Sequence, residues 1–220
     1  MTSYHDQKGV GLIEVMVAVL LLSIAVLGFS ALQMRAINAT DESLVRTKSL
    51  TLVRNLSEIM RAYPNAYVTG SATSFTTAAP TVTNSVSTVQ AVMSSSATST
   101  LTVDTKTIDI TNSANSCLST GTKQETVDSI VKTVPAQHCN MSQLAARDTL
   151  MFKKIAKDED ISMTVVTCPG TTTQAIQTQM CVIAAWNDTK AMLSDSDANA
   201  CATSNGVYKT GGHCLISEAY

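Results

Sequence analysis

Residues 10–32 have the sequence VGLIEVMVAVLLLSIAVLGFSAL, an apolar stretch of 23 residues with one charged side chain, Glu14. In a helix that rises ~1.5 Å per residue, this length spans a hydrocarbon core of ~30 Å. A cleaved secretory signal is excluded because the apolar run is too long, no small-x-small cleavage site follows it, and polar helix-forming sequence continues directly from it. A plain single-pass anchor remains an alternative.

Glu14 is the informative residue within this stretch. An ionised carboxylate in hydrocarbon is costly unless it is neutralised or paired. One interpretation is that Glu14 meets a cationic partner that arrives on assembly. The other is that Glu14 lies near the membrane interface and reaches water.

The residues around the start of the apolar stretch resemble a known processing signal. Lys8-Gly9 followed by Val10-Gly11-Leu12-Ile13-Glu14 is similar to the class III signal of type IV prepilins, although Gly11 departs from the commoner Thr or Ser. The resemblance implies that prepilin peptidase cuts between Gly9 and Val10 and methylates the new Val10 amine. It also implies that Glu14 pairs with the Val10 amine of a neighbouring subunit in a filament.

The helix is expected to continue beyond the apolar stretch. Residues 33–63 lack Pro and Gly, and pairs such as Leu52/Leu56 and Leu56/Met60 have the i, i+4 spacing of an apolar stripe. Pro64-Asn65 then ends the helix. The stripe as predicted comprises Leu44, Leu52, Leu56, Ile59, Met60 and Tyr63.

Residues 64–116 are predicted to form a Ser/Thr-rich connecting region. Within it, residues 69–102 favour a flexible or partly strand-like loop by composition, and residues 101–110 alternate as a strand does. Beyond it, residues 140–157 indicate a helix, and residues 161–167 and 179–186 indicate strands, the second ending in a core tryptophan, Trp186. The apolar face predicted for the second helix comprises Met141, Leu144, Met151 and Ile155.

Six cysteines lie in the C-terminal half, and their even number is typical of three disulfides formed in an oxidising compartment. They allow 15 pairings, and sequential pairing is a guess. The cysteines are Cys117, Cys139, Cys168, Cys181, Cys201 and Cys214. His138-Cys139 and His213-Cys214 leave a zinc site as an alternative, although no CxxC spacing supports it. The acidic clusters at residues 158–160 and 195–197 favour solvated loops over a calcium site.

The remaining composition argues against other classes of function. The net charge is −2, so no basic field points to nucleic acid. No GxSxG, HExxH or Gly-rich phosphate loop is present, and the only histidines are His5, His138 and His213. We therefore expect no enzyme, no cofactor and no bound metal.

Several segments also resemble the minor pilins of the PilV type. The segments that carry this likeness lie in both halves of the chain. They are residues 21–28, 31–33 and 57–62, the pattern of Cys139, Leu144-Ala145 and Asp148 with Phe152, and residues 182–186. It implies a low-abundance subunit that joins FimU-, PilW-, PilX- and PilE-like minor pilins, a PilY-type tip adhesin and the major pilin. The implied function is priming pilus assembly as part of a tip complex that supports adhesion and twitching motility, with DNA uptake as an additional option.

The sequence thus predicts an α+β, type IV pilin-like fold, in which a long N-terminal helix packs on an antiparallel sheet. The expected divisions are a leader at 1–9, a helix at 10–63 (10–32 transmembrane or filament core, 33–63 amphipathic), the connecting region at 64–116, and a disulfide-stabilised α+β head region at 117–220. The protein is expected in the inner membrane as a single-pass subunit with a periplasmic head, and then at the extracellular pilus tip. The alternatives are a type II secretion pseudopilin and a membrane-tethered periplasmic binding module.

Overall fold

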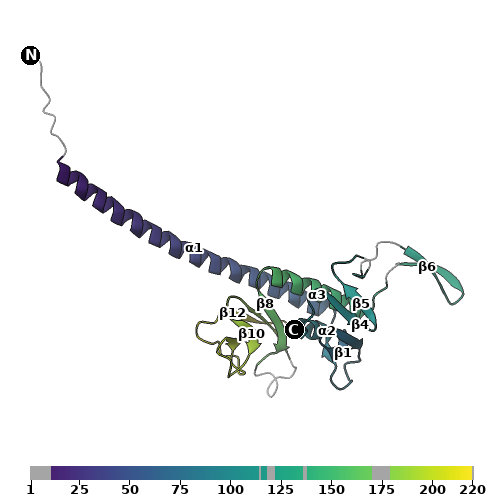
Figure 1. The fold of residues 1–220 in the computed structure, drawn as a ribbon. Coiled ribbons are helices and arrows are strands. Elements are labelled where there is room, and N and C mark those ends of the chain that lie inside the picture. The colour runs from purple at the N-terminus through teal and green to yellow at the C-terminus, as the bar shows by residue number, and fades with distance from the viewer. Residues whose placement is uncertain (1–10, 114, 118–121, 136–137, 170–178, 220) are drawn as a thin grey trace, which may run out of the picture. The chain divides into compact units, whose positions relative to one another are not determined.

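A computed structural model of the chain describes residues 11–113, 115–117, 122–135, 138–169 and 179–219 (Figure 1). The chain divides into two compact units, residues 1–46 and residues 47–220. The structure has an α+β fold, with a long N-terminal helix followed by sheets, two further helices and disulfide bonds in the described residues.

Helix α1 (Leu12–Ala62) follows from the apolar stretch and the helix-forming sequence after it. It ends just before Pro64, which has no N–H to continue the ladder. In the second unit its buried face includes Leu52, Val53, Leu56 and Met60, which confirms the central part of the predicted stripe. Leu44, placed on that stripe by the sequence, is 54% exposed.

Residues 67–109 form a mixed sheet with one short helix, which is more regular than the flexible or partly strand-like loop expected for residues 69–102. Among the described residues the sheet order is β3-β1-β2-β4-β5, and β2 pairs with β4 in parallel while the other neighbours are antiparallel. Threonine is β-branched and favours strands, and the sheet needs an apolar side chain only at alternate positions. The elements are β1 (Tyr67–Ser71), β2 (Ser74–Thr77), β3 (Val86–Ser87), α2 (Thr88–Ser94), β4 (Thr100–Val103) and β5 (Lys106–Asp109).

The segment predicted as one strand at 101–110 is a hairpin. Asp104 and Thr105 have φ values of 53° and 66°, so they form the two-residue turn between β4 and β5. Strand β1 contains a glycine where it lies close to β2: a Cβ on Gly70 would be 2.3 Å from the Ser74 carbonyl oxygen. Gly70 also has a φ of 134°, so no other residue fits there without strain.

The hydrophobic core of this region packs the sheet against α2 and α3 (Met141–Asp158). Asn140 caps α3: its side chain accepts a hydrogen bond from the Gln143 N–H at 2.8 Å, and the Gln143 side chain accepts one from the Asn140 N–H at 3.0 Å. The buried residues of the cluster are Val68, Phe75, Val92, Ala97, Leu101, Val103, Ile108, Cys117, Ala146 and Leu150.

The apolar face predicted for α3 was wrong in orientation. Met141, Met151 and Ile155 are 52%, 41% and 51% exposed, while Leu144 is partly buried. The helix instead buries a face made largely of small residues. Its buried residues are Ser142, Gln143, Ala145, Ala146, Thr149, Leu150, Phe152 and Ala156.

A second sheet follows α3, in the order β12-β9-β8 among the described residues, with antiparallel pairing throughout. The predicted strands at 161–167 and 179–186 are confirmed as β8 (Ser162–Thr167) and β9 (Met180–Ala185), and Trp186 is buried. The other strands after α3 are β10 (Lys190–Leu193), β11 (Ala200–Ala202) and β12 (Cys214–Glu218), with β10 and β11 paired in parallel.

Strands β6 (Thr122–Val127) and β7 (Ile130–Pro135) form a separate two-stranded hairpin between β5 and α3. Asp128 and Ser129 form its turn, with φ values of 53° and 65°. The disulfide between Cys117 and Cys139 closes the segment that contains this hairpin, and Cys117 belongs to the buried core. The bridge therefore joins the two chain segments on either side of the hairpin at the core of the first sheet.

Candidate functional site

The first part of α1 exposes its apolar surface on all sides. Every residue from Gly11 to Leu32 is exposed, including Leu20, Ile24 and Phe29 at about 60%. By length and composition, α1 is the helix among the described residues that can cross a membrane. A helix that is hydrophobic all round requires an apolar environment, which is lipid or other apolar helices.

The polar side chains in this part of α1 are compatible with such an environment. Ser23 donates to the Val19 carbonyl oxygen at 2.7 Å, and Ser30 donates to the Val26 carbonyl oxygen at 2.9 Å. These hydroxyls therefore carry no unpaired donor into lipid. Glu14 remains the one ionisable side chain between Leu12 and Met34.

Glu14 lies in the first turn of α1, where its N–H donates to the Gly11 carbonyl oxygen at 2.9 Å. A carboxylate is electrostatically favoured at a helix N-terminus because the N–H groups there are unpaired and point toward it. Gly9 and Val10, the predicted cleavage and methylation positions, lie outside the described residues. Their roles, and the role of Glu14 in assembly, stay predictions.

Two contacts in the second unit tie the end of α1 to α3. The Tyr63 hydroxyl donates to Asp148 Oδ2 at 2.5 Å, and the Lys48 ammonium forms an ion pair with Glu159. Because Lys48 precedes Tyr63 while Glu159 follows Asp148, the two helices run antiparallel. Burial, the Asp148 hydrogen bond and the Asp148 charge raise the pKa of Tyr63 to about 12.

Asp104 connects the sheet to the N-terminus of α3. Its carboxylate accepts hydrogen bonds from the N–H and hydroxyl of Thr77 and from Asn140 Nδ2 at 2.9 Å. Gln143 Nε2 adds a bond to the Val103 carbonyl oxygen at 3.1 Å. Burial pushes the pKa of Asp104 upward, but the bonds from Thr77 and Asn140 outweigh it and hold this pKa below its ordinary value.

The six cysteines form disulfides in chain order: Cys117–Cys139, Cys168–Cys181 and Cys201–Cys214. The second bridge links the end of β8 to β9, and the third links β11 to β12. No thiolate among them is free to bind a metal ion. His138 and His213, considered above as zinc ligands, belong to no group of three metal-binding side chains in the part of the chain that the structure describes.

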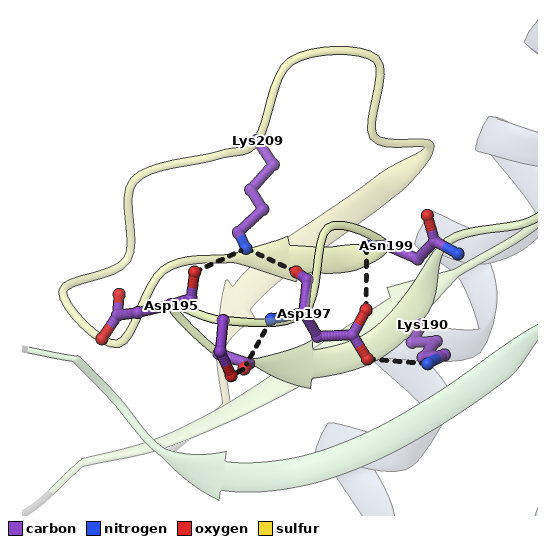
Figure 2. Close-up of polar contacts among 7 residues, drawn as sticks. Lys190, Asp195, Asp197, Asn199 and Lys209 are labelled. Carbon is purple, nitrogen blue, oxygen red and sulfur yellow. Dashed lines mark hydrogen bonds and ion pairs between the residues drawn. The ribbon is translucent and has the colours of Figure 1, made fainter.

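The acidic cluster at 195–197 is held by hydrogen bonds within the C-terminal region (Figure 2). The Lys209 ammonium donates to the carbonyl oxygens of Asp195 and Asp197, and the Asp197 carboxylate accepts from Lys190 at 2.7 Å and from the Asn199 N–H at 2.9 Å. The bond from Lys190, followed by that from Asn199, lowers the pKa of Asp197 below its ordinary value. The oxygens of Asp195 and Asp197 are therefore bound by Lys190 and Lys209 of the same chain, and these bonds order the loop.

Sequence reasoning missed the contacts made by Tyr63, Asp104 and Asp148. Each is a polar residue whose partner is far away along the chain, so no local pattern marks it. It also missed the β6–β7 hairpin, for which the Asp128-Ser129 turn was the available signal.

Comparison with known protein families gives two matches. The family described as Type IV pilin Tt1218 matches residues 31–150, which is more than half of the chain. The prokaryotic N-terminal methylation motif matches residues 4–30, which include Gly9, Val10 and Glu14. No curated protein and no solved structure matches the chain.

Proposed function

Because the chain belongs to the Tt1218-like family of type IV pilins, we propose that it is a minor pilin that primes pilus assembly. The family and the N-terminal methylation motif fit a membrane-anchored structural subunit that associates with other pilins and with prepilin peptidase. The proposal adds low abundance, a place in a tip complex, and a role in adhesion and twitching motility. Its proposed partners are FimU-, PilW-, PilX- and PilE-like subunits and a PilY-type adhesin.

The observation that carries the proposal is the exposed apolar part of α1 with Glu14 in its first turn. Such a surface moves from lipid into a bundle of apolar helices at little cost, because both surroundings are apolar. Glu14 gains a cationic partner in the bundle, so assembly is favoured over the dispersed membrane state. We propose that this partner is the methylated amine of Val10 in a neighbouring subunit.

The assignment to the minor class rests on the segments that resemble PilV-type pilins. Two of them meet in the compact unit of residues 47–220, which we call the head from here on, because Tyr63 directly follows residues 57–62 and its hydroxyl donates to Asp148. The helix that those proteins carry after a cysteine resembles α3, which begins at Met141, two residues after Cys139. The head is proposed to lie in the periplasm before assembly, where its disulfides form, and at the pilus tip afterwards.

The test is to delete the gene in its native host and to quantify both surface pili and the protein itself in sheared pili. We expect few pili in the deletion strain, restoration by the intact gene, and an amount of this chain far below that of the major subunit. Normal piliation, or an amount equal to the main subunit, would refute the minor-pilin assignment. Loss of protein secretion with normal pili would instead favour the type II secretion pseudopilin.

A further inference from the structure

A cavity of about 320 Å³ lies in the head beside the C-terminal half of α3 and the start of β8. Met93 at the end of α2, Ala156 of α3, and Ile161 and Met163 around the start of β8 form an apolar lining. All four are buried in the fold. The cavity is partly open to solvent.

Two lysines line the same cavity. The Lys153 ammonium donates to the carbonyl oxygens of Val92 and Ser95, at 3.2 Å and 2.5 Å, where α2 ends. An ammonium group has three N–H donors, so one remains after these two bonds. Lys157, one turn further along α3, is exposed and makes no ion pair with a described residue.

The electrostatics of this cavity favour an anion. The hydrogen-bond partners of the Lys153 ammonium among the described residues are neutral carbonyl oxygens, and burial, followed by the charge of Lys157, lowers the pKa of Lys153. Asp160 is the acidic residue among those lining the cavity, which leaves the two lysines in excess by one charge. A carboxylate placed between Lys153 and Lys157 would accept charge-assisted hydrogen bonds from both.

We propose that the cavity is a docking site for an acidic, apolar peptide segment of another pilus subunit. An apolar side chain of that segment fills the lining formed by Met93, Ile161 and Met163, and a neighbouring carboxylate lies between Lys153 and Lys157. The charge complementarity selects the acidic group, and the apolar lining selects a peptide over a free anion. That the partner is a pilus subunit rests on the proposed function, whereas the binding chemistry does not.

The binding test uses the full-length mature chain in detergent micelles and two fluorescein-labelled decapeptides. The peptides are identical except for a central Leu-Glu-Leu in one and Leu-Gln-Leu in the other. Fluorescence anisotropy should show saturable binding of the acidic peptide that is about tenfold tighter than that of the neutral one, as for one charge-assisted contact. Failure of both peptides to bind, or equal binding of the two, overturns the proposal.

Lys154 supplies a matched control for the lysines of the cavity. It is an exposed neighbour on α3, it pairs with Asp158 at 2.8 Å, and it does not line the cavity. Lys157→Glu should weaken binding of the acidic peptide about tenfold, whereas Lys154→Glu should change it less than about twofold. Equal losses would show that surface charge alone attracts the peptide and would overturn the site.

Ser162→Trp tests the cavity without changing charge, because Ser162 lines it with an exposed side chain. This variant should block the acidic peptide while its circular dichroism spectrum matches the wild type. Displacement of the peptide by millimolar inorganic phosphate would indicate a simple anion site and refute a peptide groove. Self-association that Lys157→Glu abolishes would assign the cavity to a second copy of the chain, which also contradicts the proposal.

A companion measurement in cells separates this inference from the proposed function. Lys157→Glu and Lys154→Glu are each expressed in the deletion strain, and their amounts in sheared pili are compared. A selective loss of Lys157→Glu from pili supports docking to a pilus subunit, and equal incorporation of the two refutes it. Absence of even the wild-type chain from pili would refute the proposed function while the peptide result in micelles still decides the binding chemistry.

Discussion

The Tyr63 hydroxyl donates a 2.5 Å hydrogen bond to Asp148 Oδ2, joining the residue that follows α1 to the middle of α3. Asp148 also pairs with Arg147 at 2.7 Å, so its carboxylate is held from two sides. The contact fixes the chain just after α1 to α3 at a point where both partners are partly buried.

Tyr63→Phe should reduce the free energy of unfolding of the head by about 1 kcal/mol, because one hydrogen bond to a charged, partly buried acceptor is lost. Denaturant unfolding of the full chain in detergent measures it. Lys48→Ala, which removes the other tether between the two helices, should cost less, because Lys48 and Glu159 are each more than 40% exposed. A larger loss in Lys48→Ala than in Tyr63→Phe would contradict this ranking.

The hydrogen bond between Tyr63 and Asp148 also predicts that the head loses stability at alkaline pH. The pKa of Tyr63 is about 12 in the folded state and 10.0 in an unperturbed tyrosine, so the folded state holds this proton more tightly. That stabilisation is complete below pH 10 and is lost as the pH rises from 10 to 12. The difference in stability between wild type and Tyr63→Phe should therefore shrink across this window, while Tyr67→Phe, which keeps Tyr63, should track the wild type. A constant difference would contradict the assignment.

Asp104→Ala should destabilise the head by about 1–2 kcal/mol, because Thr77 and Asn140 lose their shared acceptor. Asp128→Ala is the matched control, since Asp128 has the same φ of 53° in the β6–β7 turn and carries the same backbone strain. The pKa of Asp104 is lowered in the fold, so its contribution is present above an unperturbed pKa of 3.8 and is lost as the pH falls through the folded value. Equal losses in the two variants would assign the effect to backbone strain alone.

Loss of one disulfide should destabilise the head by roughly 3 kcal/mol in the chain-entropy model. Cys168→Ser with Cys181→Ser opens a loop with a sequence separation of 13, and Cys201→Ser with Cys214→Ser opens another of the same separation. The two double variants should therefore lose similar stability. Full reduction of the wild type should lower the melting temperature further, and an unchanged melting temperature under reduction would contradict structural disulfides.

Glu14→Ala should leave cleavage of the leader intact and reduce incorporation into pili at least about tenfold, because a carboxylate in an apolar bundle contributes strongly when it is paired. Glu42→Ala removes one negative charge from α1 outside the apolar stretch and serves as the control. The amounts of each variant in sheared pili and in membranes give the incorporated fraction. Wild-type incorporation of Glu14→Ala would refute the assembly role given to Glu14.

The elements predicted well from sequence are those with a strong local signal. The apolar run marks the start of α1 and Pro64 marks its end. The residues around Asn140 mark the start of α3. The buried face of α3 was misplaced because it uses Ala145, Ala146 and Ala156, which hydropathy ranks below the exposed Met151 and Ile155. Close packing against the sheet requires the small side chains, and only the tertiary structure shows that requirement.

The first sheet was hard to predict for a different reason. Strands of two to five residues show too few alternations, and their Ser/Thr content is also typical of loops. The core needs only a few apolar residues from them, such as Val68, Phe75 and Leu101. The candidate sites differ in the same way in how far sequence predicts them. Gly9, Val10 and Glu14 form a local sequence motif, whereas the cavity beside Lys153 forms only where α2, α3 and β8 meet in the folded chain.

The central claim is that the chain is processed at Gly9 and enters a filament through its N-terminal helix. The most direct measurement is the intact mass and N-terminal sequence of the protein from cells with and without prepilin peptidase. The account predicts a chain that begins at N-methylated Val10 only when the peptidase is present, and that this form is recovered in sheared pili. An uncut chain in both strains would contradict the account and favour a membrane-tethered binding module.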